Sequence, residues 1–297
     1  MLTERVELRD LEGRIIDAPT NLKAKVDLIL EQLRSYEKVL VAFSGGVDST
    51  LLTYLAKTAL KENVVAVTAN SPSLSSSELK EAKKIATQIG VKHLIIETNE
   101  LADPNYVSNP TNRCYFCKKE LGEKLTLLAK DSGGYVVLDG TNAEDLKGHR
   151  PGAAALSEQG IRRPLTDAGM NKEEVRETAR LLGLPNFNKP SLPCLSSRVQ
   201  YGQSITAEKL LRIERSEDLV HSLTGARELR VRDHGNLARI EVARNERELF
   251  FNEKLLDEIS KGLQELGYAY VTLDLIGYRS GSMLQPSSSS TMRNRQK

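Results

Sequence analysis

Short apolar runs alternate with amphipathic segments along the chain up to about residue 200. The runs are brief and rich in Val and Ile, as in buried strands, and the segments between them carry apolar residues at helical spacing. This alternation predicts an α/β fold with a doubly wound parallel sheet. The predicted strands cover 38–43, 63–70, 92–99 and 135–142, and the predicted helices cover 21–36, 47–60, 75–90, 117–133 and 171–185.

The pattern changes after residue 201, where a helix, two strands, a helix and a strand follow one another. We expect the helices at 206–223 and 252–267, a hairpin of 227–235 with 236–244, and a strand at 268–275. This order predicts a second, smaller α+β domain. The expected domains are a polar leader (1–20), the α/β domain (21–198), the small α+β domain (199–283) and a Ser-rich disordered tail (284–297).

Composition narrows the class of protein. The 297 residues carry 42 Lys and Arg against 40 Asp and Glu, so the formal net charge is +2. This balance does not favour a nucleic-acid partner. No apolar run approaches the roughly 20 residues needed to span a bilayer, and the charged N-terminus is no secretory signal. We expect a cytoplasmic protein without a membrane partner.

Three predicted strands end in residues that suit ligand binding. Ser44-Gly45-Gly46 follows the first strand, Ala69-Asn70-Ser71 ends the second, and Asp139-Gly140-Thr141-Asn142 ends the fourth. Because ligands of such sheets bind at the carboxyl ends of the strands, we expect these three segments to face one crevice.

The turn in "AFSGGVDST" (42–50) has the features of a phosphate-binding loop. Gly45 and Gly46 allow the backbone N–H groups to approach an anion, and the helix that starts near Val47 points its positive end at the same place. Asp48 would hold Mg²⁺ or orient the loop. The Walker A lysine and the dinucleotide fingerprint are both missing. A plain strand–helix turn is the alternative interpretation, which the intact "SGGVDST" disfavours.

Ser-Gly-Gly-x-Asp-Ser resembles the PP-loop of ATP pyrophosphatases, which bind the β,γ-pyrophosphate of ATP and transfer AMP to a substrate oxygen. This resemblance implies a PP-loop fold, ATP and Mg²⁺, and an adenylating activity with Asp48 among the catalytic residues. It does not identify the substrate.

The cysteines form a second chemical signal. Cys114 and Cys117 form a Cys-x-x-Cys just before a predicted helix, and Cys194 lies in a proline-rich loop between the domains. A structural zinc would need a fourth ligand, and no histidine lies at a short ligand spacing. A redox pair with a chance third cysteine, or inert cysteines, are further alternatives. The pattern favours a [4Fe–4S] cluster, because three thiolates leave one iron open to a ligand such as sulfide.

Adenylation and sulfide delivery form one coherent chemistry. AMP makes a carboxylate or amide oxygen a leaving group, and sulfide displaces it to leave a C–S bond. The glycine turn and the three cysteines, taken together as catalytic residues, therefore predict an ATP-dependent sulfur transferase.

The chain also resembles the LarE family, ATP-dependent sulfur transferases of nickel-pincer nucleotide biosynthesis. The matching segments lie in both predicted domains: "AFSGGVDSTLL", "VLDGTNAEDLKGHRPG", "LGLPNFNKP", "SSRVQYG", "LRVRDHGNLARIEV" and "LGYAYVTLDLIGYRSGSM". Members adenylate the carboxylates of pyridinium-3,5-biscarboxylic acid mononucleotide and convert them to thiocarboxylates. The resemblance implies this nucleotide substrate, sulfide or another sulfur donor, and a homo-oligomer, with a hexamer among the options.

The resemblance also assigns residue roles. It places pyrophosphate at Ser44, Gly45, Gly46, Asp48, Ser49 and Thr50, adenosine near Ala69, Asn70 and Thr141, the substrate phosphate at Ser197, Arg198, Arg230 and Arg232, and a metal at Glu217 and Glu248. For Arg230 and Arg232 a solvated strand face is the alternative interpretation. Glu217 and Glu248 have the alternative of ordinary exposed helix carboxylates.

The cysteines depart from part of the family. Some members sacrifice the sulfur of a single cysteine before Ser-Ser-Arg, whereas Cys194 is offset by one position and the Cys-x-x-Cys is additional. This pattern looks like a cluster-bearing branch that turns over with external sulfide. The rival functions are a [4Fe–4S]-dependent tRNA thiolase, an amide synthetase with a structural zinc, and a non-enzymatic sensor of ATP and iron.

Overall fold

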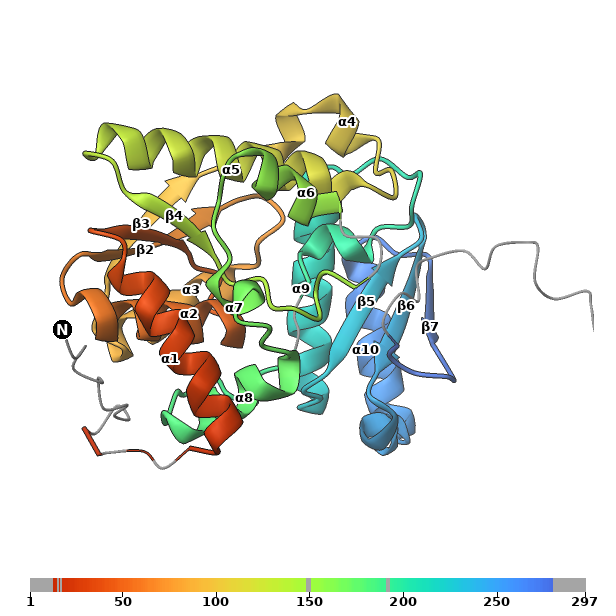
Figure 1. Ribbon diagram of the computed structural model, residues 1–297. Helices are drawn as coiled ribbons and strands as arrows, with labels where there is room; N and C mark the ends of the chain where they lie inside the picture. The colour runs from red at the N-terminus through yellow and green to blue at the C-terminus, as the bar shows by residue number, and fades with distance from the viewer. Residues whose placement is uncertain (1–12, 15, 17, 148–150, 191–192, 280–297) are drawn as a thin grey trace, which may run out of the picture. The chain divides into compact units, whose positions relative to one another are not determined.

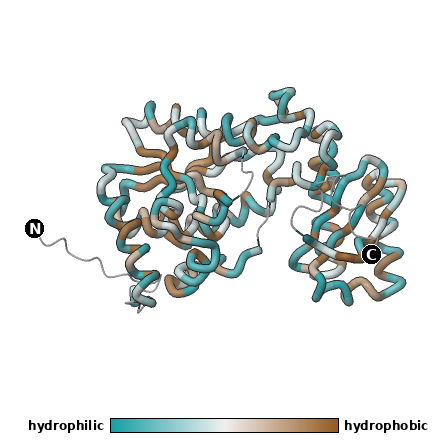
Figure 2. Tube along the Cα trace, turned by 45° about the vertical axis from the view of Figure 1, so that its right-hand side comes forward, coloured by the Kyte–Doolittle hydropathy of each residue, from teal (hydrophilic) through white to brown (hydrophobic). Residues whose placement is uncertain are grey.

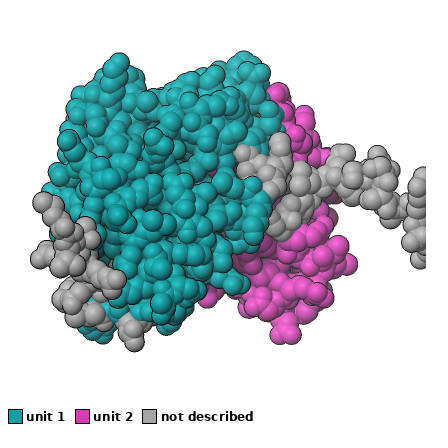
Figure 3. Space-filling view, viewed as in Figure 1, with its two compact units in different colours: residues 1–106, 112–193 teal, residues 107–111, 194–297 magenta. Residues whose placement is uncertain are grey.

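The structure is a computed structural model and describes residues 13, 14, 16, 18–147, 151–190 and 193–279. It contains two compact units (Figure 3). Unit 1 comprises the chain up to Tyr106 and Asn112–Pro193, and unit 2 comprises Val107–Thr111 and the chain from Cys194. The predicted tail and most of the predicted leader lie outside the described residues.

Unit 1 contains a parallel four-stranded sheet (Figure 1). Its strands are β1 (Val39–Ala42), β2 (Val64–Asn70), β3 (Lys92–Glu97) and β4 (Val136–Asp139), in the order β3-β2-β1-β4. All three pairings are parallel. The strand order reverses direction between β1 and β4, and such switch points are where open α/β sheets bind ligands. The predicted doubly wound parallel sheet is confirmed.

Helices cover both faces of this sheet. One core joins α1 (Thr20–Arg34), α2 (Val47–Leu60), α3 (Ser76–Gln88) and α8 (Lys172–Leu181) to Val39 and Val41 of β1. The other core joins α5 (Arg113–Asp131) and α6 (Pro151–Glu158) to Leu40. Alternate residues of β1 thus enter opposite cores, so the apolar strands lie inside the unit (Figure 2). Short helical segments join these elements: η1 (Glu100–Ala102), α4 (Pro104–Val107) and α7 (Pro164–Asp167).

Helix α5 begins earlier than the sequence predicts. It starts at Arg113 rather than at 117, so Cys114 lies within the helix and not before it. The N-cap residue Asn112 makes no side-chain cap hydrogen bond. Asn is nevertheless a common N-cap residue type, so Asn112 is a signal that the sequence prediction did not use.

Unit 2 contains a mixed three-stranded sheet of β5 (Leu229–Asp233), β6 (Leu237–Val242) and β7 (Tyr270–Leu273). β5 and β6 form the predicted hairpin, and β7 pairs parallel to β6. Side chains of this sheet form one core with those of α9 (Ala207–Thr224) and α10 (Glu253–Glu265). Two 3-10 segments complete the unit, η2 (Leu195–Arg198) and η3 (Arg244–Phe250). The predicted second, smaller α+β fold is confirmed.

Residues 107–111 and 194–198 belong to unit 2, although the sequence pattern groups them with the first domain. Their partners explain this. The Asn109 side chain donates to the carbonyl of Gln200 at 2.8 Å, and Arg198 forms an ion pair with Glu217 of α9. Among the described residues, no helix is both long and apolar enough to cross a bilayer.

Candidate functional site

The glycine turn joins the central strand β1 to helix α2. Gly45 has φ +69°, and a Cβ at this position would lie 2.9 Å from the Cα of Ala82 on α3. Gly46 is the N-cap residue of α2. The turn is therefore packed against α3 so closely that no side chain fits, and the N-terminus of α2 stands at the carboxyl end of the sheet, as anion sites require.

We expect Gly45→Ala to lose more stability than its backbone angle alone explains. Gly160→Ala is the matched control, because Gly160 has φ +70° but open space around its missing Cβ. The contact with Ala82 should add about 1–3 kcal/mol to the loss. Urea unfolding of the two variants measures the difference. Equal losses of unfolding free energy would show that α3 can shift to accommodate the added methyl group at no cost.

The serine hydroxyl groups of the turn form hydrogen bonds within the turn. The Oγ atoms of Ser44 and Ser49 lie 3.2 Å apart, and Ser49 Oγ donates to the carbonyl of Gly46 at 3.1 Å. Ser44 is exposed, whereas Ser49 and Thr50 are buried. The hydroxyl of Thr50 accepts a hydrogen bond from Asn186, so it faces the protein interior. Direct contact of these hydroxyls with ATP remains a prediction.

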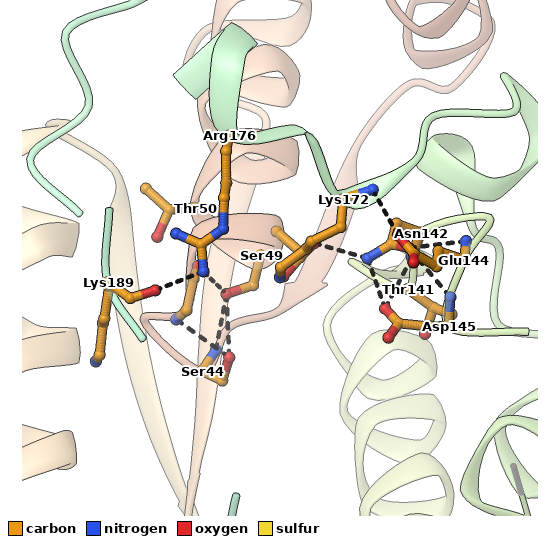
Figure 4. A network of polar contacts seen from close by, with 12 residues as sticks. Ser44, Ser49, Thr50, Thr141, Asn142, Glu144, Asp145, Lys172, Arg176 and Lys189 are labelled. Carbon is orange, nitrogen blue, oxygen red and sulfur yellow. Dashed lines mark hydrogen bonds and ion pairs between the residues drawn. The ribbon is translucent and has the colours of Figure 1, made fainter. Parts of the chain in front are cut away.

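Asp48 connects the turn to two distant parts of unit 1, and its partners Asn142 and Lys172 are labelled in Figure 4. Its Oδ1 accepts from the side-chain amide of Asn142 at 2.9 Å, and its Oδ2 forms an ion pair with Lys172 at the start of α8. Asn142 follows β4, and Thr141 beside it hydrogen-bonds to Asp139. The structure thus brings the ends of β1 and β4 together, as the sequence predicts.

Lys172 is a site residue that the sequence analysis missed. It lies 124 residues from Asp48, and its side chain is 32% exposed. The glycine turn itself carries no Walker lysine, and Lys172 of α8 brings a cation next to Asp48. Asn171 fixes its position through a capping box with Glu174, a signal visible in the sequence as the start of a helix but not as part of this site.

A cavity of about 520 Å³ lies at the carboxyl ends of β2 and β3. The Asn70 side chain contributes to it and donates to both carboxylate oxygens of Glu97 at 3.0 Å. Neither Ala69 nor Thr141 is among its lining residues, which are Asn70, Ser71, Pro72, Leu74, Ser76, Glu97, Thr98, Asn99 and Lys124. Of the three residues predicted near adenosine, only Asn70 lines this cavity.

The cysteines lie on both units. Cys114 and Cys117 are one helical turn apart on α5 of unit 1, with Cys114 exposed and Cys117 half-buried. Cys194 is exposed and is the first residue of the second segment of unit 2. The i, i+3 spacing puts Cys114 and Cys117 on the same side of α5, which suits two thiolate ligands of one cluster. Cys194 belongs to unit 2, whereas Cys114 and Cys117 belong to unit 1.

The three arginines predicted at the substrate phosphate form a buried group in unit 2, and Ser197 is half-buried. Arg198, Arg230 and Arg232 are 3%, 1% and 5% exposed, so the solvated strand face is excluded for the latter two. Arg198 forms a two-point ion pair with Glu217, and Arg232 pairs with Glu241. Ser197 joins them: its Oγ accepts from Arg198 and its carbonyl from Arg232, both at 3.1 Å.

Arg230 lies over the ring of Tyr278, 5.1 Å from its centre. Burial, followed by the positive charge of Arg198, lowers the pKa of the Arg230 guanidinium. The group holds three arginines against two glutamates, so a bound anion would offset charge that is costly to bury.

The predicted metal carboxylates lie in different settings. Glu217 accepts from Arg198 and from the backbone N–H of Val231 at 3.0 Å, whereas Glu248 is exposed on η3. Across the described ranges, no three His, Cys, Asp or Glu side chains are grouped closely enough for a metal ion. A metal at Glu217 and Glu248 remains a prediction.

The parallel sheet, the glycine turn and the Asp48 contacts define the class of PP-loop nucleotide-binding α/β domains. An asparagine synthase family model matches residues 26–114, which include this turn. The pyridinium-3,5-bisthiocarboxylic acid mononucleotide synthase of Lactiplantibacillus plantarum is 38% identical over 88% of this chain and 94% of its own length. The chain therefore belongs to the LarE family of this synthase.

Two further relatives cover most of the chain. An uncharacterized protein of Synechocystis sp. is 46% identical over 88% of this chain and 97% of its own length. An uncharacterized protein of Methanocaldococcus jannaschii is 32% identical over 90% of this chain and 98% of its own length. The similarity therefore extends through both units.

Proposed function

We propose that this chain is an ATP-dependent sulfur transferase that converts both carboxylates of pyridinium-3,5-biscarboxylic acid mononucleotide to thiocarboxylates. The product would enter nickel-pincer nucleotide cofactor biosynthesis. The similarity to the named synthase over both units supports this substrate. The observation that carries the proposal is the contact of Asp48 with Asn142 and Lys172 beside the glycine turn. It brings a carboxylate that could hold Mg²⁺ and a cation together at a helix N-terminus, which suits an anion.

Adenylation is the first step of the proposed reaction. A carboxylate oxygen attacks the α-phosphorus of ATP, the bond to the bridging oxygen breaks, and pyrophosphate leaves with the electron pair. The N–H groups of the turn would hold the pyrophosphate, and Lys172 would offset the charge that grows on it. Asp48 would hold Mg²⁺, which when bound neutralises phosphate charge. The place of Asn70 in the cavity at the ends of β2 and β3 supports an adenosine site there.

The buried arginines of unit 2 support binding of the substrate phosphate. Arginine forks suit two-point contacts with phosphate, and Ser197 adds a hydroxyl. A phosphate would replace part of the present pairing of Arg198 with Glu217 and would supply negative charge next to Arg230.

Sulfur enters in the second step, in which sulfide attacks the adenylated carboxyl carbon and AMP leaves. We propose that Cys114, Cys117 and Cys194 hold a [4Fe–4S] cluster, which when bound would supply that sulfide. The support is the number of thiols, the exposure of Cys114 and Cys194, and the helical spacing of Cys114 and Cys117. The thiols are expected to stay reduced in a cytoplasmic setting.

We also propose a homo-oligomer. The family resemblance supports it, and so do large apolar side chains exposed in unit 2, among them Phe251 and Leu275 at 77% and 81%. Such side chains are commonly covered when subunits associate.

The proposed reaction is tested by incubating anaerobically purified protein with ATP, Mg²⁺, sulfide and the biscarboxylic mononucleotide, with tRNA in a parallel arm. We expect the nucleotide to gain sulfur and AMP to form in equal amount, as measured by mass spectrometry. Thiolated tRNA with an unchanged nucleotide would overturn the assignment in favour of a tRNA thiolase.

A further inference from the structure

The side chain of Asn186 lies beneath the glycine turn, in the segment that follows α8. Asn186 is 4% exposed. Its Nδ2 donates to the carbonyl oxygen of Gly45 at 2.9 Å and to the Oγ1 of Thr50 at 3.0 Å. The turn is thus held from its inner side by a side chain 141 residues further along the chain.

The bond to Gly45 fixes the direction of one peptide plane. The peptide between Gly45 and Gly46 is trans, so the N–H of Gly46 points opposite to the carbonyl of Gly45. When Asn186 holds the carbonyl inward, the N–H faces the outer side, where it makes only a long contact of 3.3 Å to Ser44 Oγ. Because both residues are glycines, little steric hindrance opposes rotation of this plane. A rotated plane would present an oxygen to an anion.

Asn186 is itself firmly placed. Arg176 of α8 donates to the carbonyls of Phe187 and Lys189 at 3.0 and 2.8 Å. Lys189 pairs with Glu78 and Glu81 of α3, next to Ala82, which packs against Gly45. The Asn186 segment therefore joins the two helices that frame the turn. The Asn186 Oδ1 has no hydrogen-bond partner among the described residues, so the side chain acts on the turn as a donor.

We propose that Asn186 is a positioning residue that sets the Gly45–Gly46 peptide so that the Gly46 N–H can bind the pyrophosphate part of ATP. This inference rests on the proposed function, which supplies the identity of the anion. Aspartate at this position would place an oxygen against the Gly45 carbonyl oxygen, so Asn186→Asp should disturb the peptide more than Asn186→Ala does.

The test compares affinity for inorganic pyrophosphate with affinity for AMP, by calorimetry on the purified full chain. Asn186→Ala should weaken pyrophosphate binding about tenfold, as for loss of a hydrogen bond to a charged group. It should change AMP affinity less than about twofold and raise the KM for ATP more than it lowers kcat. Asn188→Ala is the matched control, because Asn188 is exposed on the same segment.

Asn186→Ser, which keeps a donor, gives a second variant if the alanine variant does not fold. It should bind pyrophosphate with an affinity between wild type and Asn186→Asp. Unchanged pyrophosphate affinity in the Asn186 variants, or equal losses for pyrophosphate and AMP, would overturn the inference alone. A wild-type chain that binds neither ATP nor pyrophosphate would overturn the proposed function and this inference with it.

Discussion

Replacing Lys172 with methionine is expected to slow adenylation about 100-fold, as loss of one preorganised charge contact to a transition state does. The Lys172 ammonium pairs with Asp48 at the glycine turn, and we propose that it meets the leaving pyrophosphate there. Methionine keeps much of the length of the side chain without its charge. Pyrophosphate release in the presence of substrate, ATP and Mg²⁺ measures the effect.

Lys25→Met is the matched control for this variant. Lys25 pairs with Glu174 on the same helix α8, and its side chain is 29% exposed against 32% for Lys172. Both variants lose one ion pair that α8 makes with another helix, but only Lys172→Met removes a charge beside the glycine turn. Equal adenylation rates in the two variants would show that Lys172 has a structural role alone.

The order of elements was predictable from the sequence because most strands and helices of both units carry strong periodic patterns. The assignment of segments to domains failed where it depends on contacts between residues far apart in the sequence. Residues 107–111 join unit 2 through Asn109, whose partners lie about 90 positions away, and no local period records such a contact. The start of α5 was placed too late, although Asn112 is of a residue type that often precedes a helix.

The site was predictable where one short segment carries it. The glycine turn and Asp48 follow directly from "SGGVDST". Asn142 was expected near this turn because both follow strands of the same parallel sheet. Lys172 and Asn186 are ordinary residues in a helix and a loop, and only folding brings them to the turn. Arg230 and Arg232 alternate like a solvated strand, yet both are buried, so their burial could not be read from spacing.

Replacing Cys117 with serine is expected to abolish sulfur insertion and to leave adenylation within about twofold of wild type. Serine lacks the thiolate that an iron–sulfur cluster requires. Cys117 lies on α5, outside the Asp48 contacts that we propose serve the ATP step. Cys114→Ser and Cys194→Ser should behave alike if three thiols hold one cluster. Iron content, visible absorption and thiocarboxylate yield are measured on anaerobically purified protein, alongside pyrophosphate release.

The metal bound by the wild-type chain decides between the interpretations of the cysteines. A cluster predicts about four irons per chain, lost in each serine variant. Phe116→Leu, a neighbour on α5, serves as the control and should keep its iron. Zinc in place of iron would indicate a structural site instead. An iron-free chain that loses the mass of one sulfur from Cys194 during turnover would make that thiol the donor, and Cys117→Ser would then still insert sulfur once. Multiple turnovers with external sulfide separate the two outcomes, because a consumed thiol cannot act twice.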